Sequence, residues 1–198
     1  MSNVIPLILL CLVLGSCRGN GQTDSNRNVS ASVAANSNSN INAGETKQES
    51  SDRVLTARAK LALLGNKLTG AYDINASAQD GVVTLTGVMD IKEAAAGAAD
   101  LVRFMKGVKG VNNQIQVDPL AKPIPATAPE EQIDKEVKGV LKSDPGLQSL
   151  NVRSKGGEIM LTGSVDTHER LLEAATAIRK VNGVRFVYTK QVDVRNDP

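Results

Sequence analysis

The chain has 198 residues and a net charge of +2, so its overall charge gives no reason to expect a nucleic acid or a membrane surface as partner. Its two cysteines are too few for a disulfide scaffold. The length allows one or two domains.

Residues 1–17 resemble a bacterial lipoprotein signal peptide. The apolar run 4–14 is too short to span a bilayer and suits the hydrophobic region of a signal. It ends in Leu14-Gly15-Ser16-Cys17, the pattern of a lipobox in which Cys17 is lipidated. The segment before the run has no Lys or Arg, so an ordinary secretory signal with a chance cysteine is the alternative. Cys11 would leave with the signal, and each domain would then be held by packing alone.

Residues 18–51 are rich in Asn and Ser and poor in apolar side chains, so we expect a disordered tether. A coil of this length reaches about 30–35 Å, enough to hold the domains near a membrane but clear of it. Arg18 follows the expected lipidated cysteine, where an Asp would signal retention in the inner membrane of enterobacteria. We therefore expect a periplasmic protein, lipid-anchored, with the outer membrane favoured.

The segment 52–118 predicts a first domain. Apolar residues at helical spacing predict an amphipathic helix over about 53–67, and alternation predicts a short strand near 72–76. Asp80-Gly81 predicts a hairpin turn, because glycine readily takes the positive φ that tight turns need. A strand with Leu85-Thr86-Gly87 follows, and Gly87 is expected to end it.

A second helix and a last strand complete this domain. The spacing of Asp90 and Glu93 predicts a capping box at the start of the helix. The helix is expected to run to about Met105 and to stop at Gly107. Apolar residues from 108 to 117 predict the strand after it.

A proline-rich linker, 119–129, separates this domain from a second one at 130–195, which repeats the order of elements. The second hairpin turn is expected to be two residues shorter, and the last strand holds one inserted residue. Five motif positions recur, and we expect their roles to be structural. The first copy has Gly81, Gly87, Asp90, Glu93 and Gly107, and the second has Gly157, Gly163, Asp166, Glu169 and Gly183.

Each unit therefore reads helix, strand, strand, helix, strand. A right-handed crossover through the second helix places the third strand parallel to the second, whereas the hairpin places the first strand antiparallel to it. We predict an α+β fold with two tandem α-β-β-α-β domains. Each is a three-stranded mixed sheet with two helices on one face.

The repeated Leu-Thr-Gly strands, the Asp-containing helix starts and the Gly-Val-x-x-Val strands resemble two BON domains, over about 52–118 and 130–195. This resemblance implies an envelope protein that binds anionic phospholipid or envelope components, supports envelope integrity or tolerance of osmotic stress, and has no catalytic activity. A protein–protein adaptor or stress scaffold with no lipid preference is the alternative. The lipid or protein partner stays open.

Few residues suggest a catalytic, metal or nucleic-acid-binding site. His168 is the single histidine, whereas a metal site needs several ligands that converge. The Asp/Glu pairs have the spacing of helix caps rather than of an acid–base pair. The Gly107 to Gly110 spacing of a nucleic-acid clamp is lost in the second copy, and the chain has few aromatic residues for base stacking. We therefore expect no enzyme, no metal, no cofactor and no nucleic-acid partner.

The two copies differ in the helix after the Leu-Thr-Gly strand, which holds small residues in the first copy and larger ones in the second. Leu172 is expected at the edge of the apolar stripe beside cationic side chains, an arrangement that suits a lipid headgroup boundary. The alternatives are a solvated face and the seam between the domains. The expected lipid-binding residues are Leu172, Arg179, Lys180, Arg170 and Arg185.

Overall fold

The computed structural model describes residues 47–125 and 128–196. The expected signal peptide, Cys17 and the tether as far as residue 46 lie outside the described residues. The last five residues assigned to the tether, 47–51, belong to the first helix. That helix therefore begins before the predicted residue 53.

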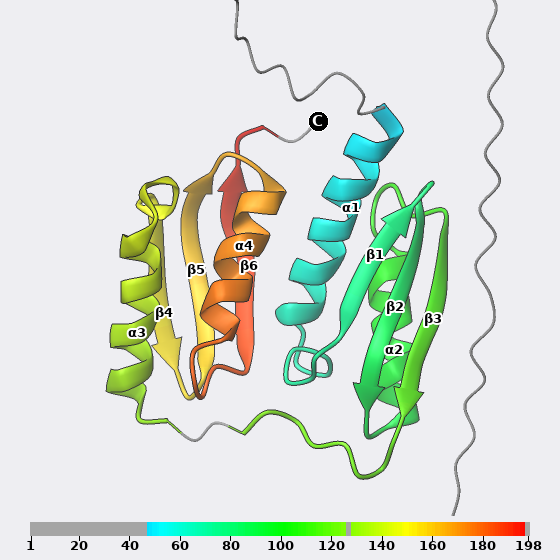
Figure 1. The fold of residues 1–198 in the computed structure, drawn as a ribbon, viewed down its shortest axis with the longest axis horizontal. Coiled ribbons are helices and arrows are strands. Elements are labelled where there is room, and N and C mark those ends of the chain that lie inside the picture. Colours follow the sequence, from blue (N-terminus) through cyan, green and yellow to red (C-terminus); the bar gives the residue numbers. More distant parts are fainter. Residues whose placement is uncertain (1–46, 126–127, 197–198) are drawn as a thin grey trace, which may run out of the picture. The chain divides into compact units, whose positions relative to one another are not determined.

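The first domain holds three strands, with the Leu-Thr-Gly strand at the centre of its sheet (Figure 1). β1 pairs with β2 antiparallel, and β2 pairs with β3 parallel, as predicted. The helices contact the strands on either side, α1 against β1 and α2 against β3. The elements are α1 (Lys47–Leu64), β1 (Asn75–Gln79), β2 (Val82–Met89), α2 (Lys92–Arg103) and β3 (Gly110–Val117).

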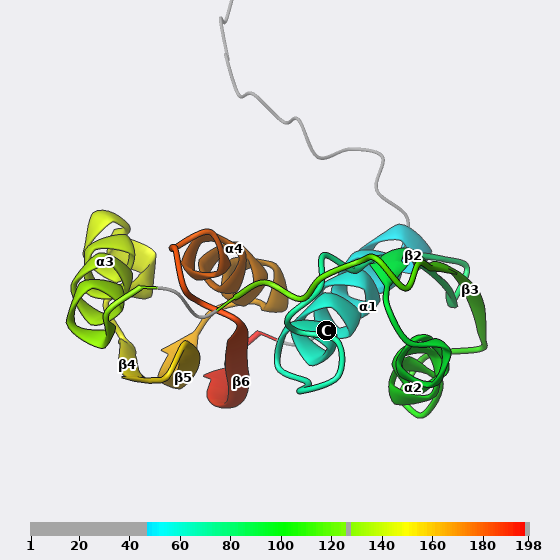
Figure 2. The same ribbon diagram turned by 90° about the horizontal axis from the view of Figure 1, so that it is seen from below.

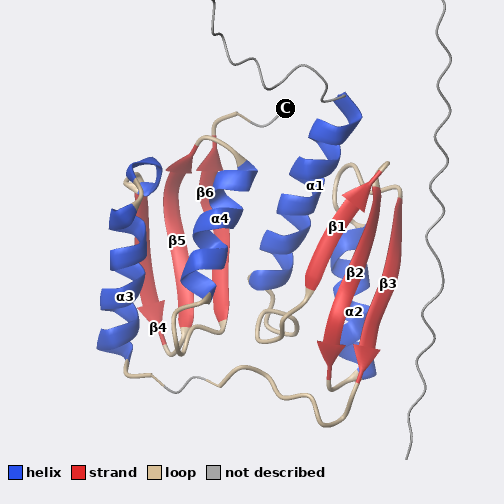
Figure 3. Ribbon diagram, in the orientation of Figure 1, coloured by secondary structure: helices blue, strands red, loops and turns tan. Residues whose placement is uncertain are grey.

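The second domain repeats this topology with a sheet in the order β4-β5-β6 (Figure 3). A short 3₁₀ helix, η1, lies between its first helix and first strand. The inserted residue in the last strand produces a bulge, where Met160 pairs with Tyr188 but Thr162 pairs with Gln191. The elements are α3 (Glu130–Ser143), η1 (Pro145–Leu147), β4 (Leu150–Lys155), β5 (Glu158–Val165), α4 (His168–Arg179) and β6 (Phe186–Val194).

Both helices of each domain cover one face of its sheet, which Figure 2 shows most clearly for α3 and α4. The inward side chains of the central strand are fully buried beneath them, Val83 and Leu85 in β2 and Ile159 and Leu161 in β5. Alternation along a strand puts every second residue on this face. The predicted fold class is therefore confirmed.

The two hairpin turns are equal in length, which corrects the expectation of a shorter second turn. Asp80-Gly81 joins β1 to β2, and Gly156-Gly157 joins β4 to β5, with positive φ at all four residues. The length difference lies earlier, in the connection between the first helix and the first strand, which spans 65–74 in the first domain and 144–149 in the second. In the second domain η1 shortens that connection.

Gly87 and Gly163 do not end the central strands, contrary to the prediction. β2 continues to Met89 and β5 to Val165, because the parallel partner strands run on beside them. The glycines are needed for a close backbone approach instead. A Cβ at Gly163 would lie 2.1 Å from the carbonyl oxygen of Ser149.

The first predicted capping box does not form. The N-cap of α2 is Ile91, which makes no side-chain cap, and the Asp90 carboxylate instead accepts a 2.6 Å hydrogen bond from the Tyr72 hydroxyl. Asp90 lies one residue too early to reach the free N–H groups of the first turn. In α4 the N-cap is Thr167, whose hydroxyl accepts from Arg170 N at 3.2 Å, and not Asp166.

The second helix of the first domain, α2, ends at Arg103, before the predicted Met105, and its counterpart α4 ends at Arg179. Gly107 and Gly183 have positive φ in the loops that follow, so both glycines turn the chain toward the last strand. Within the described part of the chain, no helix is long and apolar enough to cross a membrane.

Candidate functional site

The first helix, α1, is buried on two faces. Leu55, Ala59 and Leu63 pack into the core of the first domain. Leu61 belongs to the core cluster of the second domain, and Leu64 packs against that cluster. One helix therefore contributes to two cores, and a seam joins the domains along α1, α4 and β6.

The counterpart helix, α3, is buried on one face. Its ridge of Ile133, Val137 and Leu141 is buried, as the Leu55–Leu63 ridge of α1 is. Aligning these ridges places Gly139 and Lys142 of α3 at the positions of Leu61 and Leu64, and both are exposed. The outer face of α1 is apolar because the second domain covers it, whereas the outer face of α3 is polar.

Polar contacts fix the same seam. Arg179 Nε donates to the Gly70 carbonyl at 3.1 Å, and its Nη1 donates to the Val184 carbonyl at 2.9 Å. Burial lowers the pKa of the Arg179 guanidinium, and nearby Asp73 opposes this shift. At the edge of the seam, Lys67 Nζ lies 3.9 Å from the Glu158 carboxylate.

Arg179 therefore lies in the seam between the domains, which was one of the alternatives to a lipid contact. Its Nε and Nη1 donate hydrogen bonds to backbone carbonyls. Leu172 packs partly against the second core. The other expected lipid contacts are spread along α4 and beyond. Arg170, at the first turn of α4, forms ion pairs with Asp144 at 2.5 Å and Glu173 at 3.3 Å.

The remaining two lie past the other end of α4. Lys180 is exposed at its C-cap, and the Arg185 guanidinium lies 5.0 Å from the centre of the Phe186 ring. Lys180 lies ten positions after Arg170, which corresponds to a helical rise of about 15 Å. The structure thus does not gather the five residues into one surface.

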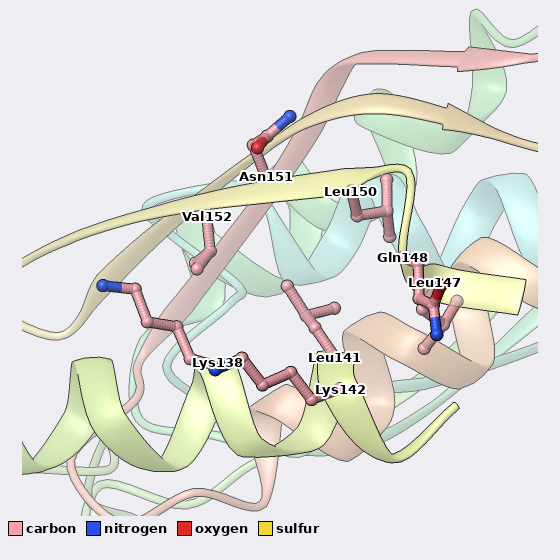
Figure 4. Close-up of a pocket in the computed structure, with 8 residues that line it drawn as sticks. All are labelled: Lys138, Leu141, Lys142, Leu147, Gln148, Leu150, Asn151 and Val152. Atoms are coloured by element: carbon pink, nitrogen blue, oxygen red, sulfur yellow. The ribbon is translucent and has the colours of Figure 1, made fainter. Parts of the chain in front are cut away.

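A pocket that the sequence did not reveal lies between α3 and the edge strand β4. Its volume is about 510 Å³. Figure 4 shows Leu141 pointing from α3 toward β4, and Val152 pointing back toward the helix, while Asn151 points away. The lining residues are Lys138, Leu141, Lys142, Leu147, Gln148, Leu150, Asn151 and Val152.

The pocket combines an apolar floor with a cationic mouth. Leu141, Leu147 and Leu150 are buried and form the floor. Lys138 and Lys142 are exposed on α3, and Lys138 Nζ forms an ion pair with Asp134 at 2.6 Å. An apolar cleft with a few polar groups at its rim is the usual form of a ligand site.

A comparison of the two first helices could have indicated this site. Gly139 and Lys142 stand in α3 where α1 has the apolar seam residues Leu61 and Leu64, so the sequence already distinguishes a covered helix from an exposed one. The pocket itself depends on η1, which carries Leu147 to its floor. No periodicity in 144–149 predicts that turn.

Among residues 47–125 and 128–196, no three His, Cys, Asp or Glu side chains lie close enough together to hold a metal ion. His168 is the first residue of α4 and is half-buried. Burial, together with its hydrogen bond to Asp90, raises the pKa of Tyr72 to about 12. This phenol is a structural hydrogen-bond donor.

Two α-β-β-α-β units with glycine-marked central strands define the class of protein. The family described as BON domain matches residues 51–119 and 129–196, and the chain belongs to it. Osmotically-inducible protein Y of Escherichia coli is 24% identical over 187 residues, covering 92% of this chain and 93% of that protein.

Solved structures of CdsD, a structural protein of the type III secretion system of Chlamydia trachomatis, also show similarity. One, of the C-terminal domain, is 18% identical with a TM-score of 0.30 and covers 72% of this chain and 67% of that chain. Another is 19% identical with a TM-score of 0.29, covering 71% and 62%. Scores this low support no functional argument.

Proposed function

We propose that this protein is a non-enzymatic lipoprotein of the bacterial envelope that binds anionic phospholipid and supports the envelope under osmotic stress. The similarity to osmotically-inducible protein Y over nearly the whole chain supports the stress-related role. The sequence pattern at Cys17 supports export to the periplasm and lipid anchoring, with the outer membrane favoured.

The observation that carries the binding function is the α3–β4 pocket. Lys142 and Lys138 stand at its mouth above a floor of leucines. A phospholipid offers a phosphate for the ammonium groups and an apolar glycerol and acyl region for the leucines. Basic residues near an anionic membrane surface each contribute about 1 kcal/mol to binding.

A protein partner is the second candidate, and one feature favours it. β4 is an outer strand of its sheet and borders the pocket. An edge strand offers unpaired backbone groups to which an extended peptide can add as a further strand. In this case the leucine floor would receive alternate side chains of the peptide, and the protein would be an adaptor with no lipid preference.

Sedimentation with vesicles separates the two candidates. The mature chain from residue 17 onward, carrying Cys17→Ser, keeps every described residue and removes the lipid. We expect it to pellet with vesicles that contain phosphatidylglycerol and to stay in solution with phosphatidylcholine alone. The Lys142→Glu variant should bind about fivefold to tenfold more weakly, because it replaces an attractive charge with a repulsive one.

Lys135→Glu is the matched control, since Lys135 is also exposed on α3 but does not line the pocket. It makes the same charge change and should alter binding by less than about twofold. Equal losses in both variants would mean that net charge, and not the pocket, drives binding. If the parent chain does not bind anionic vesicles, this result would favour the protein–protein adaptor.

The proposed lipid anchor at Cys17 is tested by a separate experiment. Detergent phase partitioning of the full chain should place the parent in the detergent phase and the Cys17→Ala variant in the aqueous phase. An unchanged distribution would rule out lipidation at Cys17, and this outcome would leave the pocket experiment unaffected.

A further inference from the structure

One of the four aromatic side chains in the protein is almost fully exposed. Phe104, at the C-cap of α2, is 86% exposed. Burying a phenylalanine side chain stabilises a fold, so leaving this one in water forgoes the stabilisation that its burial would give. Its counterpart in the repeat is Lys180, so the fold does not require an aromatic residue here.

The loop that carries Phe104 is cationic. The segment 103–109 holds Arg103, Lys106 and Lys109 and no acidic residue. All three are exposed, and Arg103 forms an ion pair with Asp100. Arg58 of α1 adds a fourth cation, since its Nη1 donates to the Lys106 carbonyl at 3.3 Å. A bulky apolar residue among cations is the composition of a contact with an anionic lipid surface.

This loop lies at the end of the domain where the chain enters α1 (Figure 1). Asp52, in the second turn of α1, accepts from Asp80 N at 2.7 Å and Gly81 N at 2.9 Å. Lys109 N donates to the Gly81 carbonyl at 2.8 Å. These bonds join the start of α1, the β1–β2 turn and the α2–β3 loop at one end of the first domain.

The covalent chain leads from this end back to Cys17. Between Cys17 and Lys47 lies the segment expected to be the tether, which as a coil would reach about 30 Å. A membrane held by a lipid at Cys17, as proposed above, would lie within reach of the end of the domain that presents Phe104. Leu120, which is 83% exposed, follows β3 and lies at the opposite end, about 25 Å away along the strand.

We propose that the α2–β3 loop is a second membrane contact, in which Phe104 inserts among the headgroups of an anionic bilayer while Lys106, Lys109 and Arg58 face the phosphates. This contact rests on the proposed membrane association but not on the α3–β4 pocket. It orients the first domain with the start of α1 toward the membrane.

A single-tryptophan reporter tests the insertion directly, because the chain has no tryptophan of its own. Phe104→Trp, in the mature chain with Cys17→Ser, should shift its fluorescence to the blue with phosphatidylglycerol vesicles and be quenched by brominated lipid. Leu120→Trp is the matched control, since Leu120 is about as exposed but at the other end. A reporter at 104 that stays quenchable by aqueous iodide, as the one at 120 should, would overturn the proposal.

Measurements of vesicle binding show how much each residue of the loop contributes to the affinity. Phe104→Glu should weaken binding to anionic vesicles about tenfold or more, because it removes the inserted side chain and adds repulsion. Lys106→Glu should weaken it about fivefold, and the loss should shrink in high salt. Leu120→Glu should bind as the parent does. Both loop residues are exposed, so circular dichroism should show unchanged folding.

The outcomes separate this contact from the pocket. If Lys142→Glu weakens binding and Phe104→Glu does not, the loop contact is wrong and the proposed pocket stands. If Phe104→Glu weakens binding and Lys142→Glu does not, the loop contact stands and the pocket is not the lipid site. A parent chain that binds no anionic vesicles overturns both.

Discussion

Arg179 Nε donates to the carbonyl oxygen of Gly70, a residue 109 positions earlier in the chain. The guanidinium comes from the last turn of α4, and the carbonyl comes from the loop after α1, so the bond joins the two domains. Gly70 is buried, and a Cβ there would lie 2.8 Å from Cδ1 of Phe186. Backbone of the first domain is thus packed closely against side chains of the second.

Arg179→Ala should lower the free energy of unfolding by about 1–3 kcal/mol, because the carbonyls of Gly70 and Val184 lose their donor. Urea unfolding followed by circular dichroism measures this. Arg103→Ala is the control from the repeat, where the aligned arginine is exposed and pairs with Asp100. It should cost less than about 0.5 kcal/mol. Equal costs would mean that the seam bond contributes nothing to stability.

Leu61→Ala should cost about 2–4 kcal/mol, since Leu61 is buried in the core of the second domain. The loss should appear in the second domain as well as the first. Amide hydrogen exchange would show it as faster exchange in α4 and β6. Protection that falls in the first domain alone would show that the domains do not share this core in solution.

Gly139→Ala should instead raise the stability of the protein. Gly139 occupies the position of Leu61 in α3, and a Cβ there meets nothing within 4 Å. Alanine at an exposed helix interior is favoured over glycine by about 0.5–1 kcal/mol. Thermal unfolding should therefore occur at a higher temperature. A lower temperature would mean that α3 packs against something on its outer face.

Much of the fold could be predicted because two copies carry the same local signals. Asp80-Gly81 and Gly156-Gly157 mark hairpins by local chemistry, and Val83 and Leu85 alternate as a half-buried strand must. The helix starts were less predictable, since Asp90 lies one residue from a working N-cap and the Tyr72 hydroxyl competes for it. Long-range packing, and not local sequence propensity, therefore decides whether Asp90 caps the helix.

The candidate sites were harder to predict for the same reason. Arg179 and Lys180 are neighbours in sequence, yet one is held in the seam and the other is exposed. Which of them is free depends on where α1 packs, and no local pattern encodes this. The composition of α1 does carry the information, because Leu61 and Leu64 have no apolar counterparts in α3.

Asp52 should make stability depend on pH. Burial raises the pKa of its carboxyl, but the hydrogen bonds from Gly81 N, Asp80 N and Gln48 outweigh burial, so the pKa is lowered overall. A lowered folded pKa means stability that is present above the unfolded value of about 3.9 and lost as pH falls through the folded value. Asp52→Asn, which has one acceptor oxygen, should cost about 1–2 kcal/mol at pH 7.

The cost of Asp52→Asn should shrink as pH drops below about 4, where the parent carboxylate takes up its proton. Urea unfolding at pH 7 and pH 3 measures the difference. Asp193→Asn is the control, because Asp193 is exposed on β6, and it should change stability by less than about 0.5 kcal/mol at either pH. A cost at Asp52 that is the same at both pH values contradicts the assignment of the bonds to an ionised carboxylate.

Gly163→Ala should be the most damaging small substitution in the second domain. Its φ of +118° is a conformation that side chains with a Cβ rarely adopt, and the added Cβ would lie 2.1 Å from the Ser149 carbonyl oxygen. That oxygen belongs to the backbone entering β4, so relieving the clash would displace the edge strand from its pairing with β5. We expect a loss of about 3 kcal/mol or more.

Gly156→Ala makes the same change in the hairpin turn, at a φ of +59° with no atom within 4 Å, and should cost about 1–2 kcal/mol. Urea unfolding of the two variants side by side separates the clash from the conformational strain, and equal losses would show that the backbone approach at Gly163 is relieved without cost.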